Sequence, residues 1–243
     1  MIEIKELSLR FGNKKILKNI NCELKGGVYG ILGPNGAGKT TLFRCMAGLY
    51  DHYTGEILMD DRKKDRKKAN LGYLPQRFSI FQDLRVLDNM QYFAALQGIA
   101  KSDRKKRIAD CLKAVNMEQY VNHKGSRLSG GMLRRIGIAQ ALLTDPEILL
   151  LDEPTVGLDP EERIHFKEII AGLREDMIVM MATHILEDIE SCCKMVLVMK
   201  DGEICFTGNG DTLRRQAQKK TLKAAGKTEP TIEDGYLCVI KNF

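Results

Sequence analysis

The chain has 243 residues, of which 44% are hydrophobic and 29% are charged, a composition typical of a globular protein with one large domain or two small ones. No apolar run approaches the about 18 residues needed to cross a bilayer, and the N-terminus lacks the basic-then-apolar layout of a secretion signal. We therefore expect a cytoplasmic protein that reaches a membrane only through a partner.

Charge and cysteine content exclude few functions. The net charge of +6 is mild, and much of it comes from two basic runs, at 62–68 and 101–107. Such runs can mark a surface for nucleic acid or anionic lipid but are more often solvated loops or helix faces, so we expect no direct binding to nucleic acid. The seven cysteines form no Cys-x-x-Cys pair, which indicates reduced thiols and no cysteine metal site.

The strand patterns are of two kinds. Residues 2–11 place Ile2, Ile4, Leu7, Leu9 and Phe11 broadly on one face, with one slip near Glu6. This period of two predicts a half-buried antiparallel strand. Segments 55–59 and 71–74 look like further short strands. The near-continuous apolar runs at 28–32, 148–151, 177–181 and 195–199 instead predict strands buried on both faces of a parallel sheet. Helical patterns separate them, which is the alternation of an α/β nucleotide-binding core.

A glycine-rich loop follows the first of these buried strands. Residues 33–40 fit the pattern of a glycine, four residues and then Gly-Lys-Ser/Thr, and a helical pattern follows. Glycines let successive backbone N–H groups face one concavity, and the helix adds its positive N-terminal end. Lys39 can then reach the β- and γ-phosphates of a nucleotide, and the Thr40 hydroxyl can bind Mg²⁺. The expected nucleotide contacts are Gly33, Pro34, Asn35, Gly36, Ala37, Gly38, Lys39, Thr40 and Thr41.

The alternative for this loop is an ordinary turn between a strand and a helix, which the full context disfavours. The next stretch, 78–143, contains no clear strand and three helix-like segments, at 86–98, 103–116 and 130–143. Ser129 is a good N-cap for the third helix, and Gly130 and Gly131 leave its first N–H groups uncovered. By itself this pattern indicates helix capping, but in a phosphate-binding protein it is also a candidate second phosphate site.

The apolar strand at 148–151 runs into two carboxylates, Asp152 and Glu153. In an open α/β sheet, the C-terminal ends of the strands face the ligand crevice. Asp152 can hold Mg²⁺ there, and Glu153 can orient and deprotonate an attacking water. The alternative is a strand that stops at a charged turn, and it becomes weak once the phosphate loop is present.

Three further residues are weak signals when taken singly. Gln76 follows the strand at 71–74, Asp159 lies in a turn before a helix, and His184 follows the strand that begins at residue 177. After about residue 208 the pattern weakens. For 211–243 we expect a helix, a polar link and at most one short strand.

In their order along the chain, these motifs resemble the nucleotide-binding domain of ATP-binding cassette (ABC) proteins over about residues 1–210. The ordered set is the phosphate loop at 33–40, Gln76, the signature segment at 128–132, the carboxylate strand at 148–153, the loop of Asp159, and His184. One departure is Met132, where the family usually has glutamine. Because Ser129, Gly130 and Gly131 are intact, we expect activity to survive.

The resemblance implies a fold and two cofactors, ATP and Mg²⁺. The fold is α/β: a P-loop NTPase core with a mixed, mainly parallel sheet, an N-terminal antiparallel β-subdomain, and an α-helical subdomain inserted at about 77–143, with a tail at 211–243. Phe11 would stack on adenine. Thr40, Gln76 and Asp152 would hold Mg²⁺, while Lys39, Glu153 and His184 would serve hydrolysis.

The resemblance also implies a second copy of the domain. Two nucleotide-binding domains, identical or close paralogues, would meet head to tail and enclose two ATP molecules. The phosphate held by one domain would be capped by residues of the other, and the expected nucleotide contacts in this part of the chain are Ser129, Gly130, Gly131 and Asp159. Gln76 would sense the phosphate and relay closure to whatever docks on the inserted helices.

Two kinds of function remain open within this family. One is the motor subunit of a membrane transporter, peripheral on the cytoplasmic face, with its transmembrane permease on a separate chain. The other is a soluble cassette ATPase that acts on nucleic acid, the ribosome or cofactor assembly, and it is disfavoured because the chain has no long coiled coil, zinc module or tandem cassette. A P-loop kinase or GTPase is more distant still, since there is no Asn-Lys-x-Asp run.

Among transporters, segment 71–76 followed by segment 84–99 resembles the bacterial branch that exports drugs, peptides and ions, so we favour an exporter. We expect residues 77–100 to receive the partner chain.

Overall fold

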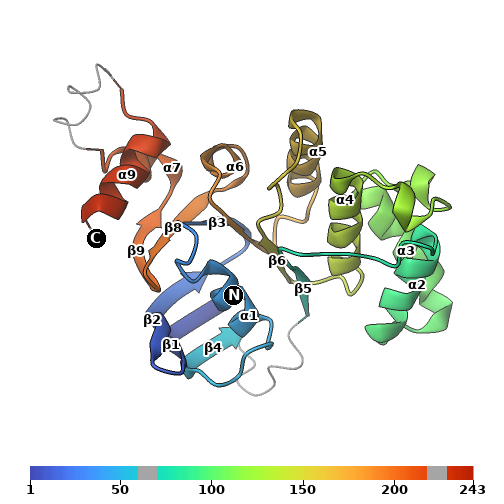
Figure 1. The fold of residues 1–243 in the computed structure, drawn as a ribbon, viewed down its shortest axis with the longest axis horizontal. Coiled ribbons are helices and arrows are strands. Elements are labelled where there is room, and N and C mark those ends of the chain that lie inside the picture. Colours follow the sequence, from blue (N-terminus) through green and yellow to red (C-terminus); the bar gives the residue numbers. More distant parts are fainter. Residues whose placement is uncertain (60–69, 218–228, 243) are drawn as a thin grey trace. The chain divides into compact units, whose positions relative to one another are not determined.

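The computed structural model describes residues 1–59, 70–217 and 229–242, which fall into two compact units (Figure 1). The first unit combines Met1–Ala69 with Ile178–Phe243, and the second is Asn70–Met177. The basic run at 62–68 lies outside the described residues. The boundary that we expect near residue 210 between cassette and tail stays a prediction. Among the described residues, no helix has both the length and the apolar character that a bilayer span requires.

The first unit opens with an antiparallel sheet in the order β2 (Lys14–Leu24), β1 (Ile2–Phe11), β4 (Thr54–Met59). The expected half-buried strand is confirmed for Ile2, Ile4, Leu7 and Leu9, which are all buried, whereas Phe11, expected on the same face, is exposed at the end of the strand. The slip near Glu6 is a bulge: its φ is 50°, and the register with β2 shifts between Ile4 and Leu7.

Strand β2 was not expected from the sequence, and a second bulge explains why. Asn19 also has a φ of 50°, and its N–H donates to Ser8 Oγ at 2.8 Å. The buried residues on β2 are therefore Leu17, Ile20 and Leu24. Spacings of three and four residues hide the period of two that marks a half-buried strand.

The second sheet of this unit carries the phosphate loop. Strand β3 (Gly27–Leu32) pairs in parallel with β7 (Ile178–Thr183) on one side and β8 (Met195–Lys200) on the other. All six residues of β7 are buried, as the apolar run predicts for a strand covered on both faces. Strand β9 (Glu203–Gly208) pairs antiparallel with β8 and makes the sheet mixed.

The C-terminal residues pack on this sheet as helices. Helix α6 (Leu186–Cys192) precedes β8, and α7 (Gly210–Arg214) and α9 (Ile232–Asn242) lie beside β8 and β9 (Figure 1). On α9, Ile232, Tyr236, Val239 and Ile240 join the core cluster, and their spacing is helical. The short strand considered for 211–243 is absent from the described part of that stretch, because this apolar stripe has the period of a helix.

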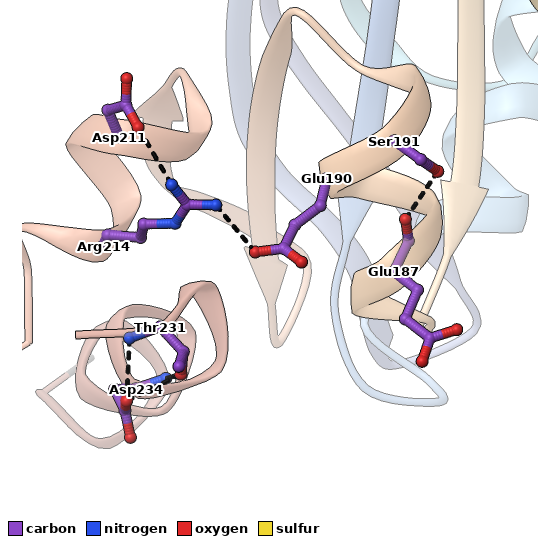
Figure 2. Close-up of polar contacts among 7 residues, drawn as sticks. All are labelled: Glu187, Glu190, Ser191, Asp211, Arg214, Thr231 and Asp234. Carbon is purple, nitrogen blue, oxygen red and sulfur yellow. Dashed lines mark hydrogen bonds and ion pairs between the residues drawn. The ribbon is translucent and has the colours of Figure 1, made fainter. Parts of the chain in front are cut away.

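Polar contacts hold these helices at their ends (Figure 2). The Arg214 guanidinium pairs with Glu190 of α6 at 2.9 Å and with Asp211 of its own helix at 3.3 Å. At the start of α9, the Thr231 hydroxyl and the Asp234 carboxylate bond to each other and to each other's backbone N–H group, which is the reciprocal arrangement of a capping box.

The second unit joins a strand pair to the inserted helices. Strand β5 (Leu71–Leu74) pairs in parallel with β6 (Ile148–Asp152). The three expected helices are α2 (Val86–Leu96), α3 (Lys101–Ala114) and α4 (Gly130–Ala141), each within two residues of its predicted bounds, and α5 (Pro160–Ala171) follows β6. Two short 3₁₀ turns, Glu118–Tyr120 and Gly125–Arg127, link α3 to α4.

Candidate functional site

The phosphate loop connects β3 to α1 (Lys39–Met46) and is closed by its own lysine. The Lys39 ammonium donates to Gly33 O at 2.6 Å and to Pro34 O at 3.4 Å. A Cβ at Gly33 would lie 2.3 Å from the backbone oxygen of Met199, so only glycine fits there. Gly38 has a φ of 105°, which L side chains rarely adopt.

The start of α1 is suited to an anion. Its N-cap is Gly38, which has no side chain to cap the first N–H groups, and its first turn contains no acidic residue. The N–H groups of the first turn and the helix dipole together favour negative charge. The expected contacts Lys39, Thr40 and Thr41 occupy this first turn.

Phe11 lies at the end of β1, 42% exposed, in a small aromatic cluster. Its ring centroid is 5.3 Å from that of Tyr50 and 5.5 Å from that of His52. Arg44 of α1 donates to the Tyr50 hydroxyl at 2.9 Å and so connects this cluster to the helix after the phosphate loop. Sequence reasoning missed Tyr50 and His52, although the aromatic-rich run at 50–53 was a signal.

Glu153 lies directly after β6, in the second unit. Asp152 is fully buried and Glu153 is 4% exposed. The backbone of Glu153 is left-handed, with a φ of 49°, a conformation that costs energy for a residue with a side chain. A cavity of about 440 Å³ in this unit is lined by Gln76, Gly130 and Glu153 among others, so three of the expected site residues meet there.

The signature segment packs on α5. The Ser129 hydroxyl accepts a hydrogen bond from Met132 N at 3.1 Å and caps α4, as the capping interpretation predicts. A Cβ added to Gly131 would lie 2.4 Å from the Glu162 side chain, which forms an ion pair with Arg135 at 2.9 Å. Sequence reasoning missed Glu162 and Arg135, because spacing alone does not say which helices touch.

Asp159 and His184 lie at the ends of other elements. Asp159 caps α5 by accepting from Glu162 N at 2.9 Å. His184 is exposed and follows β7 in the first unit, in a turn where Ile185 N donates to Thr183 Oγ1 at 3.0 Å.

The expected site residues thus divide between the two units. The first unit holds Phe11, Gly33, Pro34, Asn35, Gly36, Ala37, Gly38, Lys39, Thr40, Thr41 and His184, and the second holds Gln76, Ser129, Gly130, Gly131, Asp152, Glu153 and Asp159.

The residues expected to hold Mg²⁺ have suitable chemistry. Thr40, Gln76 and Asp152 offer a hydroxyl, an amide and a carboxylate oxygen, the hard donors that Mg²⁺ prefers. Within the described ranges there is no group of three or more histidine, cysteine, aspartate or glutamate side chains that could hold a metal. Mg²⁺ commonly binds through few protein groups plus phosphate and water.

Comparison with known proteins places the chain in a family. The family model described as "ABC transporter" matches residues 17–156. The "Linearmycin resistance ATP-binding protein LnrL" of Bacillus subtilis (strain 168) is 34% identical over 249 residues, covering 100% of this chain and 79% of its own length. The "Methionine import ATP-binding protein MetN" of Clostridioides difficile (strain 630) is 31% identical over 247 residues, covering 97% of this chain and 77% of its own.

The chain is also similar to a solved structure of an ATP-binding cassette. The dimeric, post-hydrolysis state of the ATP-binding cassette MJ0796 bound to ADP and Pi has a TM-score of 0.73 and 28% sequence identity, over 86% of this chain and 98% of that chain. The chain belongs to the ABC transporter family and is an ATPase, an ATP-binding subunit of this class. The resemblance drawn from the ordered motifs and the expected α/β P-loop NTPase fold are confirmed.

Proposed function

We propose that the chain is the ATP-hydrolysing subunit of an exporter, which it drives from the cytoplasmic face through a separate transmembrane chain. The observation that carries this proposal is an exposed apolar patch on α2 and the loop before it. Phe81, Leu84, Tyr92 and Leu96 are 51%, 42%, 45% and 68% exposed. Exposed apolar side chains grouped in this way are typical of an interaction surface.

In the proposed reaction, ATP binds with its phosphates on the loop at 33–41 and its adenine on Phe11. Lys39 and the loop N–H groups neutralise and position the phosphates. Glu153 takes a proton from water as the water oxygen attacks the γ-phosphorus, and ADP leaves with the electron pair of the broken P–O bond. His184 contacts the γ-phosphate. Thr40, Gln76 and Asp152 would hold Mg²⁺, which when bound neutralises phosphate charge.

We propose that two such domains, identical or close paralogues, work as a pair. A dimeric structure of a related cassette supports this. The phosphate-contacting residues of the partner domain would be its own copies of Ser129, Gly130, Gly131 and Asp159. The first N–H groups of α4 suit this role, because a Cβ added at Gly130 would meet nothing within 4 Å.

The occupant proposed for the α2 patch is a short amphipathic helix of the permease. Aromatic rings give the patch a firm base: Phe81 and Tyr92 pack edge to face with centroids 5.2 Å apart, and Phe78 lies 6.1 Å from Phe93. Large, rigid aromatic side chains are frequent anchors of protein interfaces.

Export is the direction that we propose. The name of one relative refers to linearmycin resistance, while that of another refers to methionine import. We favour export because segments 71–76 and 84–99 resemble the exporting branch.

The patch is tested by placing a charge on it. Tyr92→Glu and Leu96→Glu should each lower the share of the cassette recovered in washed membranes about tenfold, because one central anchor is commonly worth that much affinity. Affinity for a fluorescent ATP analogue should change less than about twofold, since the patch belongs to the second unit and the phosphate loop to the first. Ile164→Glu is the matched control, an exposed apolar residue of α5 outside the patch. Unchanged membrane recovery, or a parallel loss of ATP affinity, would contradict the assignment.

The alternative of a soluble cassette ATPase needs a separate experiment. Tagged Glu153→Gln, which should bind ATP and hydrolyse it slowly, is purified with ATP from membranes and from cytosol. Mass spectrometry should find an abundant multi-span membrane protein with it. Ribosomal or DNA-associated proteins from the cytosol alone would support the alternative.

A further inference from the structure

Arg134 makes an unusual set of contacts in the second unit. It is the fifth residue of α4, and its guanidinium donates only to backbone carbonyls. Nε donates to Pro154 O at 3.0 Å; Nη1 donates to Pro75 O at 3.1 Å and Gln76 O at 3.0 Å. Nη2 donates to Asp152 O at 2.7 Å and to Glu153 O. An arginine has five N–H donors, so every donor of this side chain is used.

The five carbonyls belong to two segments at one end of a strand pair. Pro75 and Gln76 follow β5, and the other three acceptors are at the end of β6 and just beyond it. The two strands are parallel, with Leu74 opposite Leu151, so both segments leave the sheet side by side. Arg134 fills the space between them from the signature helix.

The bond to Glu153 is the informative one. Glu153 has a φ of 49°, a left-handed conformation that a residue with a side chain adopts only when its surroundings hold it there. Three successive carbonyls, those of Asp152, Glu153 and Pro154, bond to the same guanidinium. No ordinary strand or helix directs three successive carbonyls to one point, so their convergence on Arg134 depends on the left-handed turn at Glu153.

Charge fits this arrangement. Burial lowers the pKa of Arg134 below its ordinary value, and the negative charges of Asp152 and Glu153 act to raise it. A guanidinium stays protonated in proteins, so it can donate at all five positions at neutral pH. Neighbouring Arg135 is already engaged with Glu162 and is not available for this role.

We propose that Arg134 is a positioning residue for ATP hydrolysis, which holds the backbone of Glu153 and of Gln76 in the geometry that the reaction needs. This positioning role of Arg134 rests on the proposed role of Glu153 as the base. Arg134 also connects α4, the signature helix, directly to both segments. A displacement of α4 would therefore move Glu153 and Gln76 together.

The test replaces the five-donor fork in steps, in the full chain. Arg134→Lys keeps the charge but has three donors on one atom, Arg134→Gln keeps a planar group with two donors, and Arg134→Met keeps only the bulk. Arg174→Gln is the matched control, because Arg174 also donates to a backbone carbonyl of this unit, Pro146 O at 3.1 Å, and touches neither segment. The measurements are kcat and KM for ATP with Mg²⁺, affinity for a fluorescent ATP analogue, and the thermal midpoint.

We expect kcat to fall about tenfold for Arg134→Lys and about a hundredfold for Arg134→Met, because a shift of about 1 Å in a catalytic group has effects of that size. KM and analogue affinity should change less than about threefold, and Arg134→Gln should fall between the other two. A purely structural role would instead lower the thermal midpoint and the active fraction together. A kcat that is unchanged, or that falls only with the active fraction, would overturn the proposal.

A double mutant separates this inference from the function beneath it. In a Glu153→Gln background, Arg134→Lys should cost less than about twofold further, because the group that it positions is already gone. An equal loss in both backgrounds would overturn the positioning role while leaving Glu153 as the base. Wild-type hydrolysis by Glu153→Gln alone would remove the base itself, and this inference would fail with it.

Discussion

Ser129 shows how one side chain is open to two interpretations. Its hydroxyl caps α4, and the family resemblance also gives it a phosphate to contact. Capping alone would make it one of several such residues in the chain, like Asp159 on α5 and Asn209 on α7. Substitution by glycine separates the two roles, because glycine is a fair N-cap but has no hydroxyl to contact phosphate.

Ser129→Gly and Ser129→Ala should therefore differ in stability but agree in activity. The alanine variant should lose about 1 kcal/mol and the glycine variant a few tenths, whereas both should lose kcat if the hydroxyl contacts phosphate. The measurements are thermal unfolding midpoints and steady-state ATPase rates. Wild-type kcat in Ser129→Gly would mean that capping is the whole role of this residue.

Candidate site residues that belong to a sequence motif could be proposed from the sequence, whereas a candidate whose long side chain reaches distant segments could not. Lys39 and Glu153 follow from motifs whose chemistry fixes residue type and spacing. Arg134 looked like any charged position of a helix, since nothing in the local sequence shows that its side chain ends among five carbonyls of two distant segments.

At the scale of elements, α9 illustrates a competition between propensity and packing. Gly235 is buried within this helix, where alanine would normally be favoured by about 1 kcal/mol. A Cβ there, however, would lie 1.9 Å from the backbone oxygen of Leu213, in α7. Backbone cannot yield as a flexible side chain can, and overpacking of this kind costs about 1–3 kcal/mol.

Gly235→Ala should thus lower the thermal midpoint although it improves helix propensity. Leu237 of the same helix is 41% exposed, so Leu237→Ala is the control and should change the thermal midpoint little. Increased stability in Gly235→Ala would show that α9 moves away from α7 without cost.

The elements that the sequence failed to predict share a cause. Strand β2 contains a bulge at Asn19, and β9 is an edge strand whose residues are mostly half-buried, so neither shows a clean period of two. The strands of the phosphate-loop sheet were predictable because burial on both faces leaves a continuous apolar run.

At the scale of the whole molecule, two buried thiols, Cys45 and Cys111, and the half-buried thiol of Cys22 predict a dependence of stability on pH. Burial raises the pKa of Cys22 and Cys111 from 9.0 to about 12, and that of Cys45 to about 11. Above pH 9 the unfolded chain loses these protons while the folded chain keeps them. The stability that they contribute is therefore complete below that pH and is lost as the pH rises toward 11 and 12.

The measurement is the thermal midpoint at about pH 8 and about pH 10, for the wild type and for a variant with Cys22→Ala, Cys45→Ala and Cys111→Ala. The wild type should lose more stability across this interval than the variant. Because the comparison uses slopes, the stability lost on truncation itself cancels. Equal slopes would mean that these thiols ionise as readily in the folded chain as in the unfolded one.

The division of the chain into units has a consequence for its synthesis. Gly27 in β3 pairs with Ile178 in β7, and all of Asn70–Met177 comes between them. On the ribosome, the second unit is therefore fully translated before β7 and β8, the two parallel partners of β3, have been made. The phosphate loop is translated before the second unit and acquires its neighbouring strands after it, so ATP can assist only the final stage of folding.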